Sequence, residues 1–145
     1  MNNRAVMLTL GYAGLLPFYG FLAAAWSLED WPAAISVQGV IIYSLGILCF
    51  LAGTLWGRVQ SFDAPHRARL LVSNGLVLFA VAAVLTAQAW LASLALMTGY
   101  LALLWYEQGA ESLPSWYGVM RRNLTLGVVL AHGLFFTVQS VQMAS

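Results

Sequence analysis

The sequence has little charge and no lysine. Only 8% of its 145 residues are charged and 61% are hydrophobic, and all six basic residues are arginines. A water-soluble domain needs about a quarter charged residues to cover its surface, so this composition excludes one. It indicates a protein whose surface mostly faces lipid.

Residue types that form disulfides, metal sites and haem sites are also scarce. The single cysteine, Cys49, lies in an apolar run without a thiol partner for a disulfide or a metal site. The two histidines, His66 and His132, fall in different parts of the chain, which argues against a bis-histidine haem or metal site. The net charge of +1 and the absence of a basic run argue against nucleic acid. We therefore expect no nucleic-acid partner, no metal and no cofactor.

Five apolar segments are each long enough to cross a hydrocarbon core of about 30 Å, which takes roughly 20 helical residues. They cover residues 5–27, 34–57, 70–87, 90–106 and 123–143. Helices are required because the bilayer core has no water for backbone amides, and none of the segments alternates as a barrel strand does. The first segment exceeds the core of a signal peptide, so we expect a membrane helix there. The sequence predicts an all-α fold, a polytopic bundle of five transmembrane helices in one domain over residues 1–145.

The arginines occur only at alternate gaps between these segments. Arg4 precedes the first, Arg121 and Arg122 precede the fifth, and the others lie between the second and third: Arg58, Arg67 and Arg69. The intervening connections carry no basic residue. Because cytoplasmic loops collect Lys and Arg, the N-terminus is predicted to be cytoplasmic and the C-terminus outside.

Two local patterns concern helix shape and packing. Pro17 leaves the carbonyl of Ala13 without its helical donor and should bend the first helix. Small residues four apart favour close contact between helices, within the bundle or in a homo-oligomer. Such pairs are Gly53 with Gly57, Ala95 with Gly99, and Gly127 with Ala131.

His132 is the one histidine inside a predicted segment, and no Asp, Glu or Arg falls within any of the five. A charged ion pathway is therefore not indicated. One interpretation is that neutral His132 hydrogen-bonds a neighbouring helix. The other is that His132, Tyr12 and Tyr43 form an intramembrane polar site around a ligand.

A second group of candidates lies at the cytoplasmic ends of the helices. The segment from Ser112 reads as the start of a cytoplasmic helix that leads into the fifth span, with Ser112 as its cap. Glu107 can form an ion pair with Arg121 or Arg122. One interpretation is that such a pair is exposed and stabilises the fold by at most about 1 kcal/mol. Alternatively, Arg58, Arg121 and Arg122, with Glu107, contact lipid headgroups or a partner.

Three segments carry a family resemblance. Ile47–Gly57 (ILCFLAGTLWG), Gly14–Phe18 (GLLPF) and Leu113–Tyr117 (LPSWY), followed by Arg121, resemble the domain-of-unknown-function 3429 family. This resemblance spans nearly the whole chain. It implies a small multi-pass membrane protein of bacteria, with mitochondrial relatives, located in the inner (cytoplasmic) membrane. The family carries no settled activity, so the resemblance adds no catalytic residue.

Three classes of function remain. Sparse polar chemistry and abundant packing signals favour a non-enzymatic structural, accessory or scaffolding subunit among membrane lipids, as a homo-oligomer or within a larger complex. The alternative is a binder or small transporter of an apolar ligand such as quinone or lipid. An enzyme is least favoured, because no nucleophile with its base and no pair of acids occurs in the predicted segments.

Overall fold

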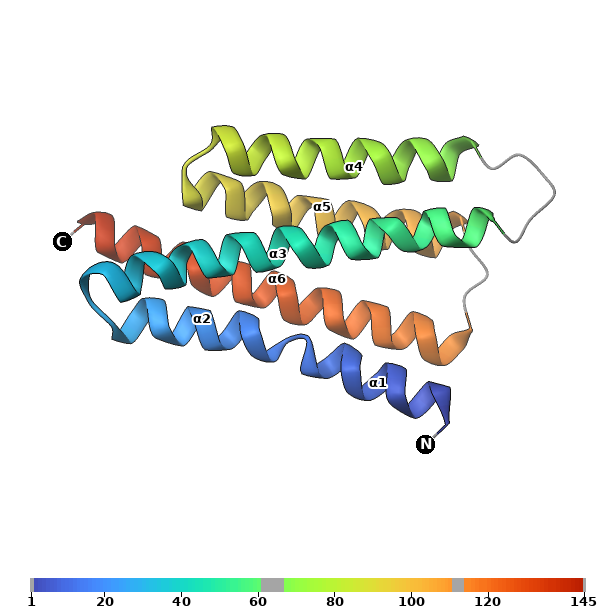
Figure 1. Ribbon diagram of the computed structural model, residues 1–145, viewed down its shortest axis with the longest axis horizontal. Helices are drawn as coiled ribbons and strands as arrows, with labels where there is room; N and C mark the ends of the chain where they lie inside the picture. Colours follow the sequence, from blue (N-terminus) through green and yellow to red (C-terminus); the bar gives the residue numbers. More distant parts are fainter. Residues whose placement is uncertain (1, 61–66, 111–113, 145) are drawn as a thin grey trace.

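The computed structural model describes residues 2–60, 67–110 and 114–144, and these form helices joined by short connections (Figure 1). The six helices are α1 (Asn3–Ala13), α2 (Leu16–Ser27), α3 (Asp30–Val59), α4 (Arg67–Thr86), α5 (Ala89–Ala110) and α6 (Ser115–Ala144). Helices α1 and α2 together form one candidate span, Asn3–Ser27. Counted in this way, the described residues contain five helical segments that are long and apolar enough to cross a membrane. The predicted all-α, five-span fold is confirmed.

Helix α3 lies at the centre of the bundle. It packs against α2, α4 and α5, while α6 packs against α5, α2 and more sparsely α1. The core between them is apolar and includes Phe18, Leu48, Leu96, Val128 and Phe135. Large apolar side chains also cover the outside, among them Leu71, Leu78, Leu85 and Trp105. Exposed apolar surface on this scale suits contact with lipid rather than water.

The first span breaks where the sequence predicts a bend. Helix α1 ends at Ala13 and α2 begins at Leu16, with Pro17 in its first turn. Proline has no N–H to donate, and its ring crowds the preceding turn. The hydroxyl of Tyr43 on α3 donates a 2.9 Å hydrogen bond to the carbonyl of Gly14, inside the break.

Each of the five spans begins before its predicted segment, because hydropathy falls where polar residues begin whereas backbone hydrogen bonding continues. The largest difference is in α6. The predicted cytoplasmic helix and fifth span form one helix from Ser115, immediately after Pro114. No further proline follows, so nothing in that stretch removes a helical donor. Ser112, the predicted cap, and His66 lie outside the described residues.

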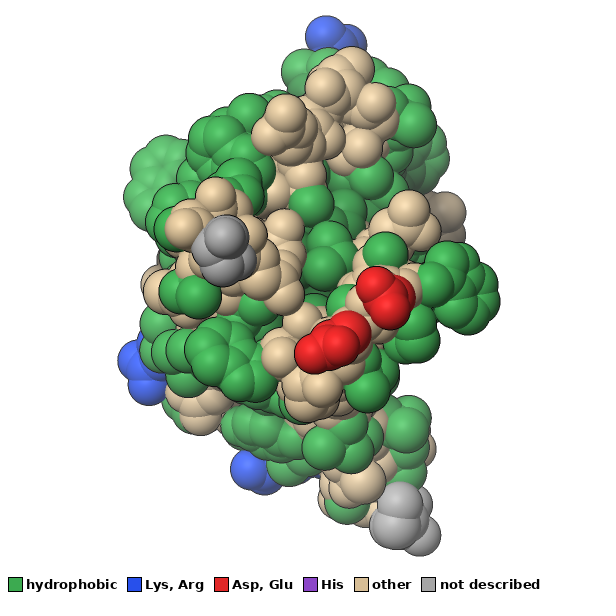
Figure 2. Space-filling model, turned by 90° about the vertical axis from the view of Figure 1, so that its left-hand side faces the viewer, with side chains coloured by type: hydrophobic (Ala, Val, Ile, Leu, Met, Phe, Trp, Pro, Cys, Tyr) green, Lys and Arg blue, Asp and Glu red, His purple; other side chains and the backbone are tan. Residues whose placement is uncertain are grey.

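Charge is divided between the two ends of the bundle. The start of α1, the end of α3 and the starts of α4 and α6 meet at one end, called here the arginine end (Figure 1). It carries Arg4, Arg58, Arg67, Arg69, Arg121 and Arg122. The exposed acids Glu29 and Asp30 lie at the opposite end, between α2 and α3, which faces the viewer in Figure 2. The segregation inferred along the sequence is therefore also a segregation in space.

Only some of the small-residue pairs lie at helix contacts. A Cβ at Gly99 would approach Leu48 of α3 to 2.8 Å, and one at Gly127 would approach Leu15 to 3.0 Å. At Gly53 and Gly57 a Cβ would meet nothing within 4 Å. This pair does not mediate packing within the bundle, because its face of α3 points outward.

Candidate functional site: a cavity beside a buried ion pair

Glu107 near the end of α5 and Arg121 near the start of α6 form an ion pair inside the protein. Oε2 of Glu107 accepts from Nε of Arg121 at 3.0 Å and from its Nη2 at 2.6 Å. The two residues are 0% and 2% exposed, so the expectation of weakly paired surface groups is wrong for them. Both helices extend past their predicted ends, which lets the side chains face each other between α5 and α6 rather than point into the headgroups.

Of the other two predicted contacts at this end, Arg58 joins the pair and Arg122 does not. Nη2 of Arg58 lies 3.9 Å from Oε1 of Glu107 and donates to the hydroxyl of Tyr117 at 3.2 Å. Its guanidinium also lies 5.4 Å from the centre of the Tyr117 ring. Arg122 is exposed. Among the described residues, Glu107 thus lies beside two arginines, Arg58 and Arg121.

Within the pair and at Thr125, three buried polar atoms have no hydrogen-bond partner among the described residues. They are Oε1 of Glu107, Nη1 of Arg121 and Oγ1 of Thr125. Because Arg121 and Thr125 are four residues apart, they lie on one face of α6. A buried polar group without a partner costs roughly 1–3 kcal/mol, so each such group requires a specific explanation.

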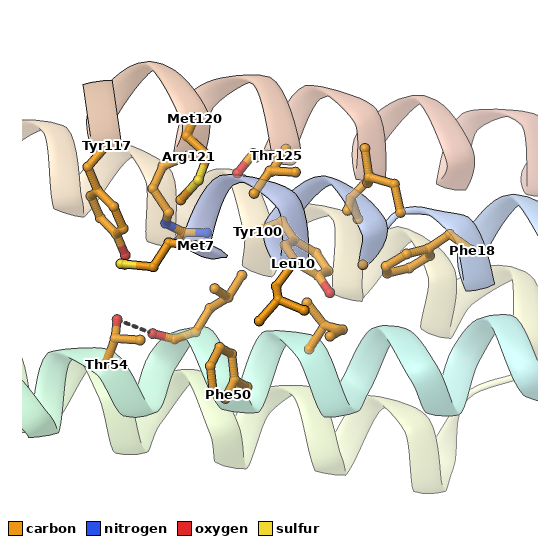
Figure 3. A pocket seen from close by; sticks show the side chains of 17 residues that line it. Met7, Leu10, Phe18, Phe50, Thr54, Tyr100, Tyr117, Met120, Arg121 and Thr125 are labelled. Atoms are coloured by element: carbon orange, nitrogen blue, oxygen red, sulfur yellow. Dashed lines mark hydrogen bonds between the residues drawn. The ribbon is translucent and has the colours of Figure 1, made fainter. Parts of the chain in front are cut away.

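The same face of α6 lines a cavity of about 340 Å³. Its other walls come from α1, the start of α2, α3 and Tyr100 of α5, as Figure 3 shows. The lining is almost entirely apolar and includes Met7, Leu10, Phe18, Phe50, Met120 and Leu124. Arg121, Thr125 and Tyr117 are its polar members on α6.

The cavity opens sideways between α1 and α3. At its edge Leu10 is 67% exposed and Phe50 is 70% exposed, and neither is covered by another helix. Figure 3 shows the two side chains projecting from their helices toward the space between them. In a protein embedded in a bilayer, this opening faces the acyl chains.

His132 is held by hydrogen bonds between three helices, as the first interpretation of the sequence expects. Its Nε2 lies 2.8 Å from the hydroxyl of Ser44 on α3, and its Nδ1 lies 2.7 Å from that of Ser93 on α5. A neutral imidazole donates through one nitrogen and accepts through the other, so the two serines complete its hydrogen bonding. Tyr100 adds a 2.8 Å bond to the carbonyl of Ser44. Among the described residues no three His, Cys, Asp or Glu side chains gather as metal ligands.

The predicted trio of His132, Tyr12 and Tyr43 does not form one site. Tyr43 caps the break in the first span, whereas the exposed Tyr12 accepts a long, 3.4 Å contact from Asn123. The ring of Phe18 lies between the other two, 4.9 Å from Tyr43 and 6.2 Å from His132. In the part of the chain that the structure describes, none of the three lines the cavity.

Sequence reasoning missed the polar face that α6 turns into the bundle. Arg121, Thr125, Val128, His132 and Phe135 are all buried, at alternating spacings of four and three residues. This is the spacing of one helix face, and the sequence contained it. The expectation that the membrane span begins near Asn123 placed Arg121 in the cytoplasmic helix before it, outside the pattern.

Fold and site together define a polytopic α-helical membrane protein with an apolar cavity between α1, α3 and α6. The chain belongs to the DUF3429 family: the family model described as "Protein of unknown function (DUF3429)" matches residues 3–137. The resemblance inferred from the three sequence segments is thereby confirmed. Searches of curated proteins and of solved structures found no match.

Proposed function

We propose that this protein binds a chain-bearing apolar ligand, a lipid or a quinone, in the cavity between α1, α3 and α6. The observation that carries the proposal is an almost wholly apolar cavity of about 340 Å³ that opens sideways. Ligand sites are typically concave, about 300–1,000 Å³ in volume, and apolar with a few polar groups. A volume at the lower end of this range holds part of a long chain, while the remainder extends through the opening into the bilayer.

The arginine end is proposed to face the cytoplasm, with the N-terminus inside and the C-terminus outside. The clustering of all six arginines at this end supports that orientation through the positive-inside rule. The cavity then lies in the cytoplasmic half of a bacterial inner membrane. The protein acts by binding, without a chemical step of its own.

A role as an accessory or scaffolding subunit remains a second candidate, and one observation favours it. Gly46, Gly53 and Gly57 lie on the exposed side of α3, where an added Cβ would meet nothing within 4 Å. Such a surface lets another helix approach closely. Native mass spectrometry of the gently extracted protein tests this role: a stable oligomer or complex supports it, and a monomer argues against it.

Photolabelling tests the ligand-binding proposal. The purified protein in nanodiscs of zwitterionic lipid is incubated with a photoactivatable hexadecanol, and the labelled residues are mapped by mass spectrometry. We expect label to concentrate on the cavity residues Met7, Leu10, Phe50 and Leu124, and to saturate with increasing probe. An even distribution over exposed apolar residues, such as those of α4, would contradict the proposal.

A variant with a filled cavity tests whether the probe binds there, and the same substitution on an exposed face is its matched control. Leu51→Trp puts a larger side chain into the cavity wall, whereas Leu78→Trp makes the same change on an exposed face of α4. We expect the first variant to lose saturable labelling and the second to retain it. Equal labelling of both variants would show that the probe binds elsewhere.

A further inference from the structure

We infer that the ligand is an uncharged amphiphile, and that Arg121 and Thr125 bind an oxygen acceptor at the head of its chain. This inference rests on the proposed function and adds the chemical class of the ligand. The shared chemistry is one uncharged oxygen, a carbonyl or a hydroxyl, attached to a long apolar chain.

Two buried donors face the cavity without an acceptor. Both hydrogen bonds of Arg121 to Glu107 use Nε and Nη2, which leaves Nη1 without an acceptor among the described residues. The hydroxyl of Thr125, four residues further along α6, also has no partner there. Both residues line the cavity and are only 2% exposed. A ligand oxygen with two lone pairs can accept from both donors.

The other hydroxyls that line the cavity show at which end such an oxygen fits. Thr54 and Tyr100 already donate to main-chain carbonyls, at 2.7 and 2.8 Å. Tyr117 accepts from Arg58, so its own hydrogen can still be donated. The available donors therefore gather at the end of the cavity where Tyr117 and Arg121 lie (Figure 3).

Glu107 supplies the negative charge beside these donors. Its Oε2 accepts both hydrogen bonds from Arg121, whereas its Oε1 has no hydrogen-bond donor among the described residues. Nη2 of Arg58 lies 3.9 Å from Oε1, which is beyond hydrogen-bonding distance. Neither Glu107 nor Arg58 is among the described residues that line the cavity. A ligand in the cavity thus contacts the guanidinium of Arg121 rather than the carboxylate.

This arrangement favours an uncharged acceptor over an anion. Arg121 and Glu107 form a buried pair whose formal charges cancel. An anion at Nη1 would be a second negative charge on the same guanidinium, and Oε1 of the first has no donor to offset its charge. Buried charges are costly unless compensated, and like charges repel strongly away from water. A carbonyl or hydroxyl oxygen accepts the same hydrogen bonds without adding charge.

The position of the donors also suits an uncharged amphiphile in a bilayer. Arg121 belongs to the arginine end of the bundle, and the apolar part of the cavity extends from it toward Phe18, away from that end (Figure 3). A ligand with its oxygen at Arg121 keeps that oxygen near the membrane surface and its chain in the hydrocarbon. An uncharged head can enter beside Leu10 and Phe50, because no charge has to cross this apolar opening.

The test compares ligands that share a chain of the same length and differ in their heads. Hexadecan-2-one, hexadecanol, hexadecane and hexadecanoate each compete with the photoactivatable hexadecanol in zwitterionic nanodiscs, at about pH 9 where a carboxylate is ionised. Their affinities are compared at equal mole fractions in the bilayer. We expect the better of the ketone and the alcohol to bind about tenfold more tightly than hexadecane and than hexadecanoate. Comparison of ketone with alcohol distinguishes a carbonyl from a hydroxyl head. If hexadecane or hexadecanoate competes as well as the better of the two, the inference is overturned.

Conservative variants locate the oxygen. Thr125→Val keeps the shape of the side chain and removes its hydroxyl, and Arg121→Lys keeps the charge beside Glu107 and removes Nη1. We expect each to lower the preference for the better oxygen ligand over hexadecane by about fivefold. Thr54→Val is the matched control, because it removes a hydroxyl of the same cavity that is already bonded, and it should retain the preference.

The outcomes separate this inference from the function on which it rests. Saturable binding without a preference for an oxygen head means that water satisfies the two donors, and the cavity remains a site for apolar chains. A preference that Thr125→Val and Arg121→Lys both retain also overturns the inference. If neither the probe nor any competitor binds saturably to the wild-type protein, the proposed function fails as well. Variants are compared only when they elute from size exclusion as the wild type does, and the comparison of ligands needs no variant.

Discussion

At the level of single residues, Glu107 and Arg121 show how charged side chains can be buried in this protein. Each is too polar to be buried alone, and each is buried because the other compensates its charge. Removing one partner of such a pair leaves an uncompensated charge, which costs more than the pair itself contributes. The pair therefore constrains how α5 and α6 meet.

Glu107→Gln should lower the free energy of unfolding by about 3–5 kcal/mol, because Arg121 then stays buried beside a neutral amide. The measurement is titration with a denaturing detergent in mixed micelles. Glu29→Gln, at an exposed position of the opposite end, should change it by less than about 0.5 kcal/mol. Similar effects of the two substitutions would mean that the Glu107 pair is solvated in the membrane-embedded protein.

His132→Phe should be destabilising by about 1–2 kcal/mol, because Ser44 and Ser93 lose the imidazole that joins them. The cost is limited because each serine can turn to a carbonyl of its own helix. The same detergent titration measures it. Binding of the hexadecanol probe should be unchanged, since His132 does not line the cavity. Loss of binding in a folded variant would bring His132 back as a ligand contact.

At the level of helices, glycines on α3 differ according to what lies opposite. Gly39 faces the ring of Phe21 on α2, whereas Gly46 faces open space. Both are followed by large apolar residues in sequence, so neighbours along the chain do not distinguish them. The distinction arises from the path of α2 beside α3.

Gly39→Ala should be destabilising by about 1–3 kcal/mol, because the new methyl group would lie 2.6 Å from the Phe21 ring. Gly46→Ala on the same helix should be neutral or stabilising by up to about 1 kcal/mol, since alanine is the better helix former. Thermal unfolding of both variants in one detergent makes the comparison. Equal midpoints for the two would show that α2 does not contact α3 as closely as described.

For the whole molecule, the division between an arginine end and an acidic end is the main electrostatic feature. It follows from five spans whose connections alternate between those with arginine and those without, and it predicts one orientation in the membrane. That orientation also decides in which half of the bilayer the proposed ligand would reach the cavity.

Single cysteines test the orientation. In a Cys49→Ser background, Ser27→Cys at the acidic end should react with a membrane-impermeant maleimide added to intact spheroplasts of a bacterial host. Gln60→Cys at the arginine end should react only after permeabilisation. Both positions are exposed, so access is decided by the membrane. The reverse pattern would place the arginine end outside and the cavity in the outer half of the bilayer.

Much of the architecture could be predicted because it depends on local properties. Hydropathy over about 20 residues identifies a span, and Pro17 breaks its helix through its own missing donor. The predicted spans stop short of the end of α5 and of the start of α6, because polar residues lower the hydropathy there. The sequence therefore offers Glu107 and Arg121 as a possible exposed pair and does not predict that they are buried.

The sequence by itself therefore determined the membrane class, the five helices, the break in the first span and the separation of charge along the axis, since each depends on composition or spacing along the chain. The tertiary structure decided which polar groups face one another and where space remains between helices. Arg121 became a buried partner of Glu107, Tyr43 a cap for Gly14, and Thr125 part of a cavity wall. These roles depend on how helices distant in sequence pack and rotate against each other, which hydropathy along a single helix does not specify.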